Sequence, residues 1–228
     1  MCERAYMNWS SGKDSAMALY ETVRTGQPEV VSLFTVVDEV TERIPMHEVG
    51  TGLLERQAAA IGLPLTLFRI GPDTHGYEDA MRETVDSFKE QGISTAVFGD
   101  INLAPVREVR EEKCRRAGLK TVFPLWGIPE EELLRAFVSA GFRAVITCVD
   151  TAVADRSLVG RIIDADFIQD VPCGADICGE SGWYHSFVFD GPVFNRPVDF
   201  RITGYGFRDY PPVGEGGAAS RFVYAEIE

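Results

Sequence analysis

A short turn near the start of the sequence combines the residue types that bind phosphate. It reads Ser10-Ser11-Gly12-Lys13-Asp14-Ser15 and lies between the apolar run Ala5 to Trp9 and a stretch with helical periodicity. A turn that opens a helix presents unpaired backbone N–H groups and the positive end of the helix dipole. Gly12 lets a ligand approach the backbone, Lys13 adds a full charge, and the serine hydroxyls can donate to phosphate oxygens. The turn therefore predicts a site for the phosphates of a nucleotide.

Asp14 adds a metal to this interpretation. Phosphate alone would repel its carboxylate, so its presence indicates a bridging divalent cation, which we expect to be Mg²⁺. A Walker A loop would need glycine at position 7 and Ser or Thr after the lysine, but the sequence has Met7 and Asp14 there. The alternative to a phosphate site is a Ser/Gly turn that joins a strand to a helix and binds nothing.

Two further acidic residues follow predicted strands. Asp38 comes directly after the apolar run Val30 to Val37, and Asp100 follows the short strand expected over Thr95 to Phe98. Ligands of open α/β sheets bind at the carboxyl ends of the strands, so both carboxylates are candidates to face the nucleotide or its metal. A solvated loop acid is an equal alternative for Asp38, and a helix cap is the alternative for Asp100.

Two histidines lie in irregular or glycine-rich sequence. His47 is the most reactive residue of the segment Glu42 to Gly50, which has no regular period, as is typical of substrate loops. His185 follows Gly179, Glu180 and Tyr184 in a stretch where glycines alternate with an acid and aromatic residues. Without a functional role, His47 would form a loop hydrogen bond and His185 would point outward from a β-hairpin.

Apolar periodicity supplies the elements that must position these groups. Strands are expected over 5–9, 30–37, 65–70, 95–98 and 121–127, and helices over 14–23, 51–61, 77–91 and 106–117. Their alternation predicts a parallel sheet with right-handed crossovers. The first helix should turn Ala16, Leu19, Tyr20 and Val23 inward.

The composition changes after Gly127. A helix is expected over 129–140 and a strand over 144–149, followed by irregular sequence. Two further strands are expected at 199–210 and 221–227. The fold class is therefore α/β, with a nucleotide-binding domain over 1–126 and a smaller C-terminal α+β domain over 127–228.

Composition limits the classes of partner. The formal net charge is −13 and no run of Lys or Arg forms a basic stripe, which argues against extended binding to nucleic acid. No apolar segment is long enough for a membrane helix and no signal-peptide pattern is present, so we expect a cytoplasmic protein without a membrane partner. The five cysteines form no Cys-x-x-Cys pair, which disfavours zinc. Cys173 and Cys178 are close enough in sequence for redox coupling, but free thiols are the main expectation.

Two separated motifs resemble one family. The loop Ser10 to Ser15, with Ser11 where glycine is usual, and the stretch from Cys178 to Pro192 resemble the diphthine-ammonia ligase family of PP-loop ATP pyrophosphatases. The resemblance implies a HUP-type, Rossmann-like nucleotide-binding domain that uses ATP and Mg²⁺. It further implies a carboxylate substrate and an ammonia donor. The expected hairpin in the tail could serve as a dimer arm, so a homodimer is an alternative to a monomer.

The resemblance also implies a reaction and roles for residues. The carboxylate would become an acyl-adenylate with release of pyrophosphate, and ammonia would then displace AMP. By position, residues 10–15 would bind the pyrophosphate part of ATP, and Gly179 and Glu180 with Tyr184 and His185 would line the substrate side. From their own places in the sequence, Asp38 is added to the expected ATP-binding residues and His47 to the expected substrate-binding residues. The chemical steps would fall to Lys13, Asp100, Glu180 and His185.

One position departs from the family pattern. Trp183 stands where a second glutamate is usual, so His185 is the expected substitute base, on the same face of an extended strand. The sequence after His185 is similar to bacterial members, where diphthamide is not made, which implies another carboxylate acceptor. Two alternatives stay open: a PP-loop enzyme with a sulfur nucleophile, as in tRNA thiolation, and a nucleotide sensor without turnover.

Overall fold

Five parallel strands form the first sheet of the computed structural model, which describes residues 3–71, 77–171, 176–210 and 220–228. The strands lie in the order β3-β2-β1-β4-β5, so the chain reverses its direction of travel across the sheet after β3. Their bounds are β1 Arg4–Asn8, β2 Glu29–Asp38, β3 Leu65–Ile70, β4 Ile93–Val97 and β5 Lys120–Val122. The expected parallel α/β sheet is confirmed, and its switch point lies beside β1, where the predicted phosphate turn begins.

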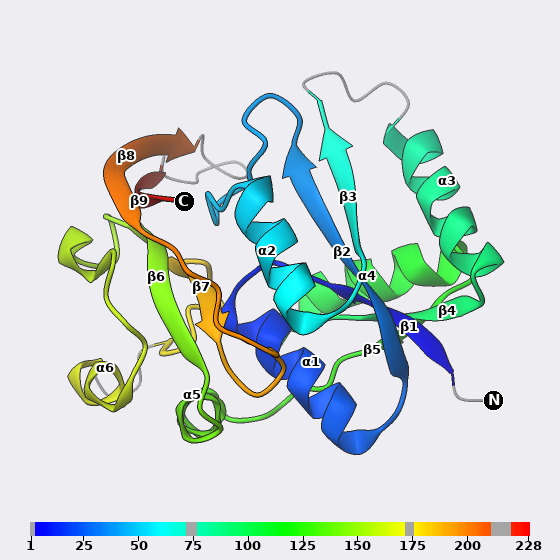
Figure 1. Cartoon of the computed structure of the whole chain (residues 1–228), viewed down its shortest axis with the longest axis horizontal. Helices are drawn as coiled ribbons and strands as arrows, with labels where there is room; N and C mark the ends of the chain where they lie inside the picture. Colours follow the sequence, from blue (N-terminus) through cyan, green and yellow to red (C-terminus); the bar gives the residue numbers. More distant parts are fainter. Residues whose placement is uncertain (1–2, 72–76, 172–175, 211–219) are drawn as a thin grey trace.

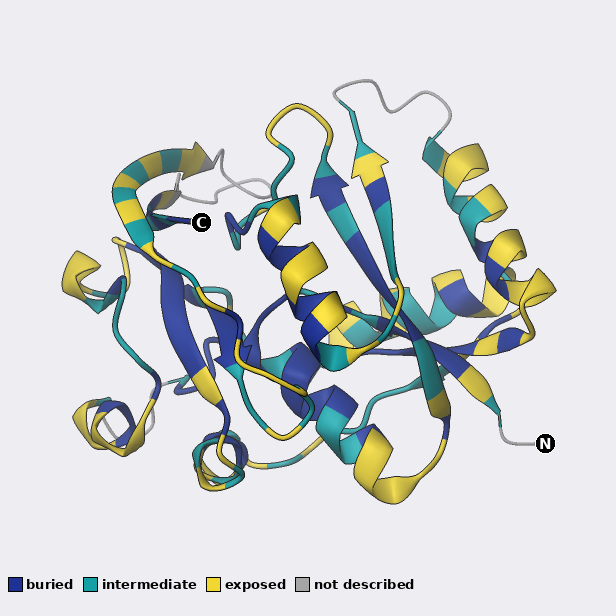
Figure 2. Ribbon diagram, in the orientation of Figure 1, coloured by how far each residue is buried: buried dark blue, intermediate teal, exposed yellow. Residues whose placement is uncertain are grey.

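Four helices cover this sheet. Helices α1 and α2 lie on the side that faces the second sheet, and α3 and α4 cover the opposite side (Figure 1). Much of α1 is buried, whereas α3 exposes most of its outer surface (Figure 2). The helices are α1 Lys13–Thr25, α2 Thr51–Ile61, α3 Tyr77–Glu90 and α4 Ala104–Arg116.

The predicted inner face of α1 is wrong at one position. Val23 is 64% exposed, and Thr22 is buried in its place. The Thr22 hydroxyl donates to the carbonyl of Ala18 at 2.7 Å, so its polar group is satisfied within the helix. The hydrophobic stripe is therefore rotated towards Thr22 at the end of α1.

An antiparallel sheet forms the second layer. Its order is β7-β6-β9-β8, and the two tail strands pair as the expected hairpin. The residues that join them, 211–217 in the prediction, lie outside the described chain. The sequence did not predict two short helices in the irregular region, η1 and α6. The bounds are α5 Glu130–Ser139, β6 Arg143–Asp150, η1 Arg156–Leu158, α6 Ala165–Asp170, β7 Tyr184–Asp190, β8 Ile202–Tyr210 and β9 Ser220–Ile227.

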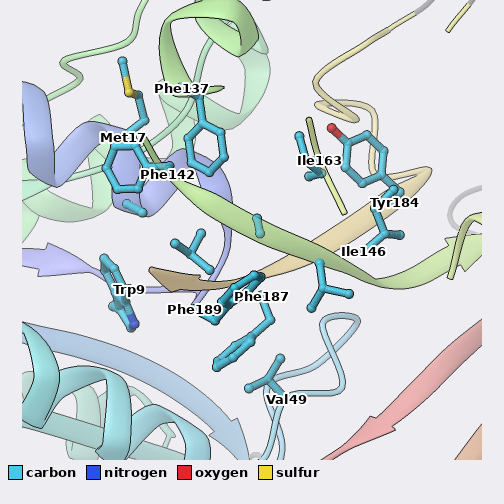
Figure 3. Close-up of a cluster of buried hydrophobic side chains, with 14 of the residues drawn as sticks. Trp9, Met17, Val49, Phe137, Phe142, Ile146, Ile163, Tyr184, Phe187 and Phe189 are labelled. Atoms are coloured by element: carbon cyan, nitrogen blue, oxygen red, sulfur yellow. The ribbon is translucent and has the colours of Figure 1, made fainter. Parts of the chain in front are cut away.

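One hydrophobic cluster joins the layers. Trp9 at the end of β1 lies near Phe187 and Phe189 of β7, and Val49 approaches from the loop before α2 (Figure 3). All four side chains are buried. Burial of aromatic side chains between the sheets therefore fixes β7 against the predicted phosphate turn. The division at residue 126 stays a prediction.

No described helix is both long and apolar enough to cross a membrane.

Gly99 sets the closest approach between β4 and α1. A Cβ at this position would lie 2.9 Å from the carbonyl carbon of Asp14 and 3.1 Å from the Ser15 nitrogen. These are backbone atoms, so a side chain can be accommodated only by moving the start of α1 away from β4.

We expect Gly99→Ala to lower the free energy of unfolding by about 2 kcal/mol, because it overpacks this contact. The measurement is urea unfolding followed by circular dichroism. Gly52→Ala is the matched control, since nothing lies within 4 Å of its added Cβ in α2. Equal stability of the two variants would contradict the prediction.

Candidate active site

A cavity of about 450 Å³ lies at the carboxyl ends of β1, β2 and β4. The phosphate turn and the start of α1 form its floor, and Phe34, Thr35 and Val36 of β2 form one wall. Segment 44–47 and the stretch from Gly179 to Ser186 close the other side. The two motifs singled out in the sequence therefore meet at one cavity.

The phosphate turn has an unusual backbone at Ser11. Its φ is 69°, in the left-handed region that disfavours residues with a Cβ. Gly12 is extended, with φ −93° and ψ 177°, and α1 begins after it without a side-chain cap. At the helix N-terminus, which lines the cavity, the Lys13 amide donates to the Ser186 hydroxyl of β7 at 3.1 Å. The glycine usual in the family at position 11 matches the conformation that Ser11 adopts here.

A buried glutamine holds this turn. Gln57 of α2 accepts a hydrogen bond from the Trp9 indole at 2.9 Å and donates to the carbonyls of Ser11, at 3.1 Å, and Val188, at 2.6 Å. The Val188 amide also donates to the Ser11 carbonyl at 2.9 Å. Gln57 was not singled out in the sequence. The signal in the sequence was a polar glutamine on the apolar stripe of the helix over 51–61, and in the structure its side chain is fully buried.

Lys13 and Asp14 form a close ion pair beside the cavity. The Lys13 ammonium lies 2.9 Å and 2.8 Å from the two carboxylate oxygens and 5.1 Å from the centre of the Tyr184 ring. Lys13 is only 4% exposed. Burial opposes its charge, but the Asp14 carboxylate raises the pKa of Lys13. The lysine is therefore a permanent cation at the start of α1, beside an acid that also lines the cavity.

Two more carboxylates lie on the opposite rim. The Asp100 carboxylate is 2.9 Å from Nε of Arg110, whose guanidinium stacks over Phe98. Oε1 of Glu180 accepts the Ile101 amide at 2.9 Å, which joins the C-terminal stretch to the loop after β4. Burial raises the pKa of Asp100 and of Glu180. Arg110 is a cavity residue that the sequence did not single out, because the charge run in α4 resembles an ordinary solvated face.

His47 and His185 face each other in the cavity wall. Their ring centres are 4.4 Å apart, with 39° between the planes. Nδ1 of His47 and Nε2 of His185 are buried without a hydrogen-bond partner. Burial lowers the pKa of His47 to about 4, with a further contribution from the Lys13 charge, and burial also lowers the pKa of His185. Both imidazoles are therefore neutral at pH 7.

Most of the predicted site residues meet here, and two do not. Ser11 acts through its backbone, and its buried hydroxyl has no partner. Asp38 lies outside the cavity lining, because its carboxylate accepts hydrogen bonds from the amide of Val40 and from the amide and hydroxyl of Thr41. It closes a turn after β2. Those that line the cavity are Ser10, Gly12, Lys13, Asp14, Ser15, His47, Asp100, Gly179, Glu180, Tyr184 and His185.

Trp183 is turned away from the cavity. It precedes β7, is buried, and donates its indole N–H to the Asp176 carbonyl at 2.7 Å. Positions 183 and 185 were expected to share one face of a strand. In the structure His185 lines the cavity, whereas Trp183 is not among its lining residues. The tryptophan packs against Tyr184 instead.

The described cysteines are buried thiols. Cys114, Cys148 and Cys178 form no disulfide with one another, and burial raises the pKa of Cys148 and Cys178 to about 12. Cys2 and Cys173 lie outside the described residues, and so does the suggested Cys173–Cys178 pair.

The fold and the cavity together define a class. A parallel sheet of this order, with a helix N-terminus and a lysine lining a cavity at the carboxyl ends of its strands, is that of HUP-like nucleotide-binding α/β proteins. The chain belongs to the diphthamide synthase family, since the family model of the N-terminal domain matches residues 3–121 and that of the C-terminal domain matches residues 129–205.

Individual relatives are distant in sequence. The diphthine–ammonia ligase of Homo sapiens is 24% identical over 217 residues, covering 83% of this chain and 79% of the relative. That of Schizosaccharomyces pombe is 26% identical over 211 residues, covering 83% of this chain and 34% of the relative. Among solved structures, the U34-tRNA thiolase NcsA from Methanococcus maripaludis aligns with a TM-score of 0.36 at 16% identity, covering 60% of this chain and 55% of the thiolase.

We expect Ser11→Gly to raise the free energy of unfolding by about 1 kcal/mol, because glycine adopts a positive φ without strain. Thermal and urea unfolding would measure the gain. Ser11→Ala is the control, since it removes the unpartnered hydroxyl but keeps the strained backbone. A loss of stability in Ser11→Gly would show that the hydroxyl makes a contact of its own.

The lowered pKa of His47 predicts a dependence of stability on pH. Between pH 6.5 and about 4 the His47 imidazole is protonated in the unfolded chain but remains neutral in the native protein. The free energy of unfolding therefore falls as the pH is lowered. One such proton accounts for at most about 1.4 kcal/mol per pH unit. In His47→Gln this fall should be shallower. Urea unfolding of both proteins at pH 7.5, 6 and 5 tests it, and parallel curves would refute it.

Proposed function

We propose that this protein is an ATP-dependent ligase that forms AMP and pyrophosphate while it joins ammonia to a carboxylate. The observation that carries the proposal is the meeting of the phosphate turn with Glu180, Tyr184 and His185 in one cavity. Family membership supports it, because the curated relatives are named diphthine–ammonia ligases.

The phosphates of ATP would bind at the start of α1. The N-terminus of α1 and the Lys13 ammonium form a donor set suited to phosphate oxygens. The Ser10 and Ser15 hydroxyls donate within the turn, to the Ser15 hydroxyl at 3.2 Å and the Gly12 carbonyl at 2.9 Å, and would have to rotate to reach a phosphate. Within the described residues no group of three or more His, Cys, Asp or Glu side chains could hold a metal ion by itself. Asp14 would therefore supply a single ligand to Mg²⁺, which would neutralise phosphate charge and take its other ligands from phosphate and water.

The first chemical step would be attack of the substrate carboxylate on the α-phosphorus of ATP, with pyrophosphate leaving. Lys13 and the α1 N-terminus offset the negative charge that develops on the departing pyrophosphate. Asp100 and Arg110 hold the opposite rim of the cavity together, and Glu180 fixes the C-terminal stretch against the loop after β4. These contacts position the carboxylate for in-line attack.

The second step would be attack of ammonia on the activated carbonyl, with AMP leaving. Ammonia must lose a proton as the C–N bond forms, so the site needs a neutral base near the carbonyl carbon. His185 is the proposed base, because it lines the cavity and is neutral at pH 7. His47 faces it and is neutral as well.

ATP–pyrophosphate exchange in the presence of a library of carboxylic acids tests this function. We expect exchange that requires one acid, falls by about 100-fold or more in Lys13→Ala and falls in Glu180→Gln. Lys120→Ala is the matched control, because Lys120 is exposed and pairs only with Glu3 among the described contacts. Tight ATP binding without exchange for any acid would overturn the ligase and favour a nucleotide sensor.

A further inference from the structure

The turn that carries His47 has a strained backbone. Met46 and Glu48, which flank the histidine, have φ values of 66° and 58°, and Glu42 earlier in the loop has 52°. None of these residues is glycine, and the left-handed region is unfavourable for each. Such a conformation persists only where surrounding structure imposes it. The relevant contacts are therefore those that hold this turn from outside.

The second sheet supplies these contacts. Arg208 of β8 meets the Glu48 carboxylate with both ends of its guanidinium fork, Nε to Oε1 at 2.7 Å and Nη2 to Oε2 at 3.1 Å. Thr147 of β6 donates its hydroxyl to the carbonyl of His47 itself at 3.1 Å. Strands β8 and β6 of the antiparallel sheet thus contact Glu48 and His47, by an ion pair and by a hydrogen bond.

The ion pair between Arg208 and Glu48 differs from the pair that Arg221 forms in the same hairpin. Glu48 is 3% exposed, so its charge depends on the guanidinium to compensate for lost hydration. Arg221 pairs in the same forked way with Asp209, but both side chains are 63% exposed and such a surface pair contributes little. The hairpin therefore carries one solvated pair and one pair whose carboxylate is buried while the Arg208 side chain is 36% exposed. The buried carboxylate, Glu48, is next to His47 in sequence.

We propose that Arg208 and Glu48 are a positioning pair that holds His47 against His185 and thereby makes the β8–β9 hairpin part of the active site. Arg208 lies beyond residues 129–205, the part matched by the family model of the C-terminal domain. Only the use of His47 in the ligase reaction depends on the proposed function. The position of the imidazole is a property of the fold and can be measured without a substrate.

The test is a nuclear magnetic resonance titration of the His47 imidazole. Arg208→Gln removes the ion pair that holds the turn, so His47 should become more exposed. Its pKa should then rise from about 4 towards the 6.5 of an exposed imidazole. Arg221→Gln removes the same side chain from the same hairpin and should leave this pKa unchanged. An unchanged pKa of His47 in folded Arg208→Gln would overturn the proposal.

A second variant separates position from charge. Lys13 and His185 act on His47 in both proteins, but Arg208→Gln also leaves the Glu48 carboxylate without its cation, which alone would raise the pKa of His47. The double variant Glu48→Gln with Arg208→Gln removes both charges. A raised pKa in the double variant supports positioning, whereas a return to about 4 would assign the effect to charge and reject it.

Thr147→Val provides the same test if Arg208→Gln fails to fold. It keeps the shape of the side chain and removes only the hydrogen bond to the His47 carbonyl. We expect a smaller rise in the pKa of His47 in the same direction. No change in this variant would overturn the role of the second sheet in holding the turn.

Catalysis separates this proposal from the ligase function. If both hold, Arg208→Gln keeps ATP–pyrophosphate exchange and its KM for ATP within about twofold, while ammonia-dependent amide formation falls about 10-fold or more. Absence of exchange in the unsubstituted protein would overturn the ligase but leave the titration of His47 decisive for the positioning pair.

Discussion

The carbonyl oxygen of Ser11 is the point on which the site depends. It accepts hydrogen bonds from the Gln57 side chain and from the Val188 amide, so one backbone atom joins α2, β7 and the phosphate turn. These bonds hold Ser11 in its left-handed conformation and leave α1 to begin at the cavity. Loss of either donor would remove the support for the strained turn and for the helix N-terminus together.

Charge around the cavity is balanced in pairs. Lys13 neutralises Asp14 and Arg110 neutralises Asp100, while Glu180 is satisfied by backbone amides. The two histidines are neutral because burial and the nearby lysine disfavour their protonation. The arrangement therefore combines a fixed cation at the start of α1 with two neutral imidazoles in the wall of the same cavity.

The sequence predicted the long elements well because their apolar periods are strong. Helix α2 and strand β3 begin and end at the predicted residues, whereas α6 was missed because it is one and a half turns long and lies in irregular sequence. Its signal was Asp164, which caps the helix by accepting the Phe167 amide.

Site residues were predictable where a local pattern carried the chemistry. The phosphate turn, Asp100 and Glu180 were predicted in this way and lie at one cavity, whereas the side chain of Asp38 closes its own turn. Arg110 and Arg208 were not singled out, because each looks in sequence like any surface arginine. Arg208 pairs with a residue 160 positions earlier, whereas Arg110 pairs with Asp100 only 10 positions away but belongs to the charge run of α4.

The pairing of Glu48 with Arg208 has a consequence for biosynthesis. The two residues are 160 positions apart, so a ribosome that adds about 5–20 residues per second makes Arg208 roughly 8–30 s after Glu48. Until then the contact between Arg208 and the Glu48 carboxylate cannot form. The nascent parallel sheet can form early, but the turn around His47 takes its final shape only when the hairpin has left the ribosome.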